Sequence, residues 1–123
     1  LRLADIINKQ TSCKADVLSF GQKDLLRECL AKSSLLTKAT SVGMAPDTNH
    51  SPLEDSSWLH PGLFVSDVIY NPRQTLLLRE ASGRGCSTGN GMYMLLYQGE
   101  AAFHFWTGLN MPVEEIRKKF FTE

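Results

Sequence analysis

Residues 63–72 read LFVSDVIYNP, and this run is the clearest strand signal in the chain. Its apolar residues occupy both odd and even positions, at Leu63, Phe64, Val65, Val68 and Ile69. Because successive side chains of a strand point to opposite faces, this pattern is typical of a parallel strand covered on both sides. Pro72 cannot donate a ladder hydrogen bond, so we expect the strand to end near Tyr70.

Helices and strands alternate on either side of this run. Apolar spacing predicts further strands at residues 15–20, 34–40 and 86–88. Helical spacing predicts helices at residues 1–10, 22–32, 74–82, 90–106 and from 112 onward. The fourth of these helices has an expected core stripe of Met92, Leu95, Leu96, Gly99, Ala102, Phe103 and Trp106. The proline-rich residues 44–61 predict a loop with one short turn. Alternating strands and helices predict an α/β fold, a parallel sheet with helices on both faces.

Composition narrows the class of protein. The chain has 123 residues, which suits one domain over residues 1–123. Lys plus Arg and Asp plus Glu each number 13, so the neutral chain lacks the basic surface that nucleic acid or an anionic membrane attracts. No apolar stretch approaches the roughly 20 residues that a membrane helix needs. We therefore expect neither a nucleic-acid partner nor a membrane partner.

The cysteines argue against a disulfide framework and against a metal site. Cys13, Cys29 and Cys86 are odd in number and show no CxxC spacing. They are interpreted as three reduced thiols of a cytoplasmic protein that holds no metal.

Candidate ligand-binding residues follow the strands, because open parallel sheets bind ligands beyond the carboxyl ends of their strands. Residues 39–44 (ATSVGM) are small and include a glycine, which suits a close ligand or an ordinary tight turn. Tyr70 has a hydroxyl that reaches such a crevice, or it fills the sheet edge. Gln98 shares a helical face with Gly91 and Met94 and suits a hydroxylated ligand, or it merely faces solvent.

The chain shows no catalytic motif of its own. It has no GxGxxG after a strand, and Gly83-Arg84-Gly85 follows a helix and lacks the third glycine. No Ser/His/Asp or Cys/His set stands out, so no catalytic residue is assigned. Asp67 lies within the predicted strand and needs a partner if it is buried.

Four motifs occur in a characteristic order: ATSVGM at 39–44, SDVIYNP at 66–72, NG through QG at 90–99, and FWTG at 105–108. Together they resemble the C-terminal part of the shikimate dehydrogenase family, over essentially the whole chain. LLYQG at 95–99, with WLHPG at 58–62 upstream, is similar to the quinate/shikimate dehydrogenase branch.

This resemblance implies an incomplete Rossmann-like domain that ends in two helices. The family's substrate domain with its catalytic Lys and Asp, its first strands and its glycine-rich loop are all absent from this sequence. The implied activity is hydride exchange between NADP or NAD and shikimate or quinate, in aromatic amino acid biosynthesis. Residues 1–123 alone are then expected to be inactive and prone to associate, with a homodimer as one form. A non-catalytic binding or interaction remnant of the scaffold is the alternative interpretation.

The resemblance also implies roles for individual residues. The cofactor would be contacted by Ser41, Val68, Ile69, Tyr70, Asn71 and the backbone carbonyl of Gly91. The substrate would be contacted by the Tyr70 hydroxyl and by Gln98. The sequence departs from the family where Lys38 replaces an Asn and where Tyr93 replaces a glycine. We expect the phenol of Tyr93 to crowd the junction of helix, strand and cofactor.

Overall fold

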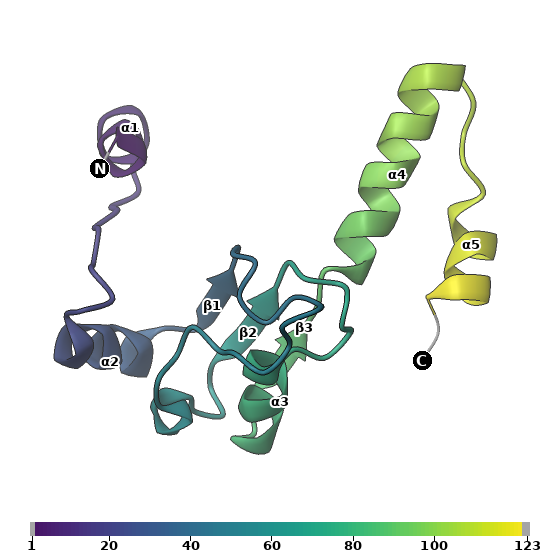
Figure 1. Ribbon diagram of the computed structural model, residues 1–123. Helices are drawn as coiled ribbons and strands as arrows, with labels where there is room; N and C mark the ends of the chain where they lie inside the picture. Colours follow the sequence, from purple (N-terminus) through teal and green to yellow (C-terminus); the bar gives the residue numbers. More distant parts are fainter. Residues whose placement is uncertain (1, 122–123) are drawn as a thin grey trace. The chain divides into compact units, whose positions relative to one another are not determined.

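The computed structural model describes residues 2–121, which form two compact units, Leu1–Lys32 and Ser33–Glu123 (Figure 1). The first unit contains α1 (Arg2–Gln10) and α2 (Lys23–Lys32). The second unit contains β1 (Leu35–Lys38), η1 (Ser56–Trp58), β2 (Phe64–Asp67), α3 (Leu76–Gly83), β3 (Ser87–Gly89), α4 (Met92–Thr107) and α5 (Val113–Phe120). This element order confirms every predicted helix and three of the four predicted strands. None of the helices within residues 2–121 is both long and apolar enough to cross a membrane.

The strand predicted at residues 15–20 is wrong, because this segment has no regular structure. The side chain of Asn8 bonds the backbone of Ala15 twice, accepting from its N–H at 2.8 Å and donating to its carbonyl at 2.7 Å. The N–H of Ser19 is taken up by the Gln22 side chain at 3.0 Å. Nearby side chains therefore occupy backbone groups that a strand would offer to a neighbouring strand.

The sheet has three parallel strands in the order β1-β2-β3, which confirms the predicted α/β class. In its register, Val65 of β2 lies between Leu36 of β1 and Thr88 of β3. The run that begins at Leu63 thus forms the central strand. Its carboxyl end lies beside the end of β1, where the N–H of Val68 continues the pairing by donating to the carbonyl of Lys38 at 3.1 Å.

Only one face of β2 is fully covered among the described residues, contrary to the prediction for this strand. Val65 and Asp67 are buried, whereas Phe64 is 42% exposed on the other face. The ring of Phe64 covers Gly89 of β3, where an added Cβ would lie 3.1 Å from the ring. The apolar residues on both faces of the run therefore predicted a strand correctly, but the face that carries Phe64 is less buried than they predicted.

The core of the second unit lies between the sheet, α3 and the loop around η1. Helix α3 contacts β2, β3 and η1 and buries Leu77, Leu78 and Ala81. Thr75 caps this helix by accepting from the N–H of Leu78. Gly85, at φ +79°, makes the turn into β3.

The thiol of Cys86 is expected to react much more slowly than the exposed thiols of Cys13 and Cys29. Burial raises the pKa of the Cys86 thiol, and the thiolate is the reactive form, so less of it is present at pH 8. A thiol-specific colorimetric reagent should therefore show two fast groups and one slow group. In denaturant all three should react quickly, and three equal rates in the folded chain would contradict this assignment.

Helix α4 is less buried than its sequence stripe predicts. Leu96 is its one fully buried side chain within the described residues, and Trp106 is 78% exposed. Helix α4 begins shortly after β3, and it contacts α5, the next helix along the chain (Figure 1). The predicted stripe is thus wrong for the end of the helix, where no described element covers Trp106.

Candidate functional site

A cavity of about 380 Å³ lies at the carboxyl ends of β1 and β2. It is lined by Ala39, Thr40, Ser41, Met44, Ala45, Val68, Ile69, Tyr70 and Asn71. The first five residues follow β1 and the other four follow β2. The structure thus brings together five of the predicted site residues at the edge where a parallel sheet is expected to bind ligands. The volume is in the range of small-molecule sites.

Two backbone hydrogen bonds shape the walls of this cavity. The N–H of Met44 donates to the carbonyl of Ser41 at 3.0 Å and closes a turn. The N–H of Ala45 donates to the carbonyl of Asn71 at 3.2 Å and ties the two walls together. Gly43 sits in the turn at φ +83°, where an added Cβ would lie 2.8 Å from the carbonyl oxygen of His50. A side chain at position 43 would therefore be strained both by conformation and by space.

A buried ion pair joins the ends of the two strands that carry the cavity. Lys38 Nζ lies 2.9 Å from Asp67 Oδ2, and the residues are 5% and 1% exposed. The ammonium also donates to the carbonyl of Val42, in the loop that forms one wall. Asp67 was expected to need a partner if buried. The sequence marks Lys38 only as a residue that differs from the family's Asn. It does not predict the ion pair with Asp67, because spacing in the sequence does not show which strands are neighbours.

The carboxylate of Asp67 has two further partners. Its Oδ1 accepts from the N–H of Ile69 at 3.0 Å, at the start of the second wall. Its Oδ2 accepts from the Thr75 hydroxyl at 2.7 Å. Because Thr75 also caps α3, one carboxylate links β1, β2, both walls and the helix that follows. Full satisfaction of a buried charge in this way is what makes its burial tolerable.

Gly91 lies against the wall formed by the residues after β2. Its N–H donates to the carbonyl of Ile69 at 2.9 Å, and an added Cβ would lie only 1.9 Å from the carbonyl oxygen of Val68. The carbonyl of Gly91 already accepts from the N–H of Leu95 at 2.9 Å, which leaves one lone pair for a ligand. Gly91 is not among the residues that line the cavity.

The structure places Gln98 and Tyr93 away from the lining of this cavity. Gln98 is exposed on α4, so in this chain its side chain faces solvent. Tyr93 is half exposed and stacks on Tyr97 with ring centroids 6.5 Å apart. The expected crowding by the phenol is thus not seen at the cavity, because Tyr93 faces two other cavities instead.

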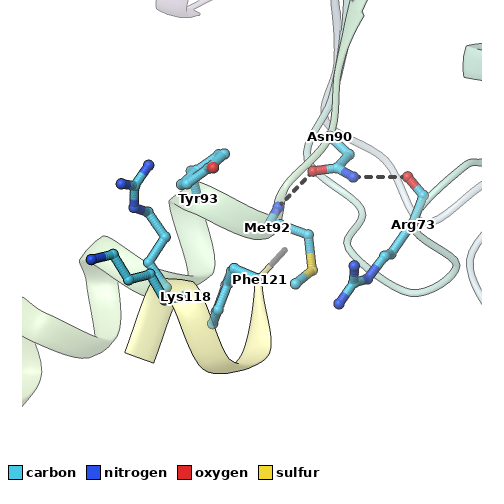
Figure 2. A pocket seen from close by; sticks show the side chains of 7 residues that line it. Arg73, Asn90, Met92, Tyr93, Lys118 and Phe121 are labelled. Atoms are coloured by element: carbon cyan, nitrogen blue, oxygen red, sulfur yellow. Dashed lines mark hydrogen bonds between the residues drawn. The ribbon is translucent and has the colours of Figure 1, made fainter. Parts of the chain in front are cut away.

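One of these other cavities lies between α4, α5 and the loop before α3 (Figure 2). It has a volume of about 410 Å³ and is lined by Arg73, Asn90, Met92, Tyr93, Arg117, Lys118 and Phe121. No motif in the sequence points to this group of residues. Its cations come from segments more than forty residues apart, and no local pattern brings them together.

No group of three or more His, Cys, Asp or Glu residues within the described part of the chain has the arrangement of a metal site. The ionisable groups at the first cavity are Tyr70 and, beneath its walls, the Lys38–Asp67 pair. Both charges of that pair are engaged with each other, so the arrangement suits holding a ligand rather than transferring a proton to it.

Comparison with known proteins identifies the relatives of this chain. Residues 91–119 match the family model described as the shikimate 5'-dehydrogenase C-terminal domain. A quinate/shikimate dehydrogenase of Escherichia coli is 41% identical over 118 residues, which are 96% of this chain and 41% of that protein. The chain corresponds to the C-terminal part of the shikimate dehydrogenase family.

Solved structures of shikimate dehydrogenase relatives share its fold. The shikimate 5-dehydrogenase of Listeria monocytogenes, in complex with shikimate and NAD, is 42% identical with a TM-score of 0.84. That match covers 94% of this chain and 40% of the Listeria chain. The quinate dehydrogenase of Corynebacterium glutamicum, in complex with NAD, is 31% identical with a TM-score of 0.79, covering 98% of this chain and 41% of that one. The sheet described above is therefore part of a Rossmann-like domain, and the chain spans about two fifths of the length of these relatives.

Proposed function

We propose that this chain supplies the nicotinamide-side wall of the NAD or NADP site in a shikimate or quinate dehydrogenase. The observation that carries this proposal is the cavity at the carboxyl ends of β1 and β2, which gathers Ser41 with residues 68–71. This chain shares its fold with the Listeria and Corynebacterium relatives, to which it is 42% and 31% identical, and both of those structures contain NAD.

The cavity has features that suit a flat, polar ring such as nicotinamide, which supplies the hydride exchange when bound. Four of the five residues in its first wall have short side chains, namely Ala39, Thr40, Ser41 and Ala45. Gly91 lets α4 approach the second wall so closely that no Cβ fits between them. Ser41, Val68, Ile69, Tyr70 and Asn71 are the proposed contacts of the cofactor. The free lone pair on the Gly91 carbonyl is a further proposed contact, directed at the carboxamide of the ring.

The proposed substrate contacts are Tyr70 and Gln98. Tyr70 is about half exposed at the mouth of the cavity, so its hydroxyl is available to a second ligand. Gln98 lies on α4 seven residues, or about two turns, beyond Gly91, and its amide suits a hydroxyl of shikimate or quinate. In this role both residues orient the substrate, and neither moves a proton.

The chemistry of hydride exchange also needs a group that takes up the hydroxyl proton of the substrate. Among the described residues no base lines the cavity. We therefore propose that residues 1–123 alone bind the cofactor weakly and do not oxidise shikimate or quinate. The rest of the activity belongs to segments that the longer relatives have and this sequence does not contain.

Titration of the isotopically labelled chain with NADH, followed by amide chemical shifts, tests this proposal. The amides of residues 41, 68–71 and 91 should shift most, at millimolar cofactor. A Ser41→Leu variant, which fills the cavity, should abolish the shifts. Ser82→Leu makes the same change at an exposed position of α3 and should leave them intact.

Two results would count against the proposal. Shifts confined to other segments, or shifts that persist in Ser41→Leu, would remove the cavity from the cofactor site. Turnover of shikimate or quinate with NAD or NADP by the purified wild-type chain would show that the chain needs no other segment.

A further inference from the structure

Helix α4 has a largely apolar face that stays exposed in the described part of the chain. Met94, Gln98, Ala101 and Phe105 are all exposed, and the exposed fraction reaches 85% at Phe105. A helix advances about 100° per residue, so these four side chains lie within an arc of about 60°. They are called the α4 face below. Trp106 lies about 100° farther round the helix and is not part of this face.

Helix α5 contacts a different side of α4. Tyr93 lines one cavity together with Arg117 and Lys118 of α5 (Figure 2). Glu100 lines another cavity together with Val113, the first residue of α5. Tyr93 and Glu100 are seven residues apart and therefore share one side of the helix. That side lies about 120° from the centre of the α4 face, so α5 leaves the α4 face free.

The α4 face carries no charge. Glu100 is the one Asp, Glu, Lys or Arg residue of α4, and it lies on the side toward α5. Surface helices normally place charged side chains on their exposed side, and an exposed apolar patch is typical of a docking site. The whole chain has a formal net charge of zero, so two copies of it do not repel each other through net charge.

The spacing of the α4 face makes it complementary to a second copy of itself. The intervals between its residues are four, three and four, which is the spacing of a helix–helix seam and is the same from either end. In an antiparallel pair, Met94 of one copy therefore meets Phe105 of the other, and Gln98 meets Ala101. A methionine thioether packs well on an aromatic ring, and the long glutamine side chain meets the smallest residue of the face.

The exposed area suits a weak dimer. Phe105 and the flanking Tyr97, which is 51% exposed, together present roughly 250–300 Å² per copy. Small stable interfaces bury about 600 Å² per partner, and Met94, Gln98 and Ala101 add further area toward this value. An interface near this lower limit gives an affinity in the micromolar range.

We propose that two copies of this chain form a weak antiparallel dimer through the α4 face. The two-fold axis passes between Gln98 and Ala101, so both copies contribute the same residues. The dimer does not depend on the proposed cofactor role, because no residue of the α4 face lines the cavity that holds Ser41. It covers Gln98, so a substrate that uses this amide would compete with the second copy.

Sedimentation velocity of the whole chain tests this proposal, in a reducing buffer that keeps the exposed Cys13 and Cys29 from cross-linking. Between about 1 and 500 μM, the wild type should pass from monomer to dimer with a Kd of about 10–100 μM. Phe105→Gln should raise the Kd at least about ten-fold, because the aromatic ring is lost from both copies. Gln98→Leu should lower the Kd at least about three-fold, because a polar side chain in such a seam reduces its stability.

Phe20→Gln is the matched control for Phe105→Gln. Phe20 is 67% exposed and lies outside α4, so the same chemical change there should keep the Kd within about two-fold. An unchanged circular dichroism spectrum of Phe105→Gln shows that its effect is not unfolding. The gain expected for Gln98→Leu cannot arise from unfolding either.

A charge pair tests the antiparallel direction. Met94→Glu and Phe105→Lys should each weaken the dimer. The double variant Met94→Glu/Phe105→Lys should dimerise more tightly than either single variant, because each new carboxylate meets a new ammonium of the other copy. Within one chain the two positions lie about 16 Å apart along α4, too far to pair with each other.

Three results would overturn the proposal. The first is a wild-type chain that stays monomeric over the whole concentration range. The second is an equal Kd in Phe105→Gln and Phe20→Gln, which would place the contact on another surface. The third is a double variant that dimerises no better than its single variants, which would exclude the antiparallel pairing.

Discussion

A Gly91→Ala variant is expected to destabilise the second unit by at least about 3 kcal/mol, above the usual range for overpacking. The added Cβ would lie 1.9 Å from the carbonyl oxygen and 2.5 Å from the carbonyl carbon of Val68. These are backbone atoms, so no side-chain rotation relieves the clash. The backbone conformation of Gly91 is ordinary, at φ −76°, so the whole effect comes from lack of space. Urea unfolding followed by circular dichroism measures the loss.

Gly99→Ala makes the same chemical change on the same helix. No atom lies within 4 Å of the Cβ that it would add, and Gly99 lies inside α4, where alanine is favoured. We expect this control to be more stable than the wild type by up to about 1 kcal/mol. Equal free energies of unfolding in the two variants would show that α4 does not pack closely on the residues after β2.

A Lys38→Met variant is expected to lose about 3–5 kcal/mol of the free energy of unfolding. The variant leaves the carboxylate of Asp67 buried without its cation, and removes the donor to the carbonyl of Val42. The loop that carries Ser41 should loosen with it. Chemical denaturation measures the first effect, and amide shifts of residues 41–45 report the second.

The double variant Lys38→Met/Asp67→Asn separates charge from shape. The oxygen of its amide keeps an acceptor for the N–H of Ile69, and its NH2 group takes the place of Oδ2 and can donate to the oxygen of the Thr75 hydroxyl. The amide carries no charge, so the double variant should recover much of the stability lost in Lys38→Met. Glu28→Gln breaks the exposed pair with Lys32 and should have a far smaller effect, because solvent screens that pair. A double variant no more stable than Lys38→Met would show that the charge of Asp67 is not what makes the single change costly.

Local pattern was enough to predict most of the fold and the position of the first cavity. The run from Leu63 to Tyr70 predicted a strand, and the end of that strand is where Tyr70 lines the cavity. Because ligands bind at the carboxyl ends of parallel strands, we expect Ser41 and Tyr70 at the same edge of the sheet, although 29 positions separate them in the sequence.

The features that the sequence did not reveal depend on which segments become neighbours. The strand predicted near Val17 fails because its backbone bonds local side chains, and apolar alternation carries no information about a pairing partner. Trp106 has the spacing of a buried residue on a helix, yet it is exposed. Spacing does not show how far along the helix other elements cover it. The cavity lined by Arg73, Tyr93 and Lys118 is formed by the loop before α3 together with α4 and α5, and none of these segments contains it alone.

The hydrogen bonds of Asp67 also determine how much the first cavity can adapt. The carboxylate connects β1, β2 and the cap of α3, and the hydrogen bond from the N–H of Ala45 to the carbonyl of Asn71 joins the same two walls. One wall therefore does not shift without straining the other, and a ligand meets a cavity of nearly fixed width. Most of the conformational entropy of these loops is lost when the chain folds, so little remains to be lost on binding. Discrimination between ligands then depends on how well each ligand fits this fixed shape. Small changes in the substituents of a ligand ring should therefore change its affinity strongly.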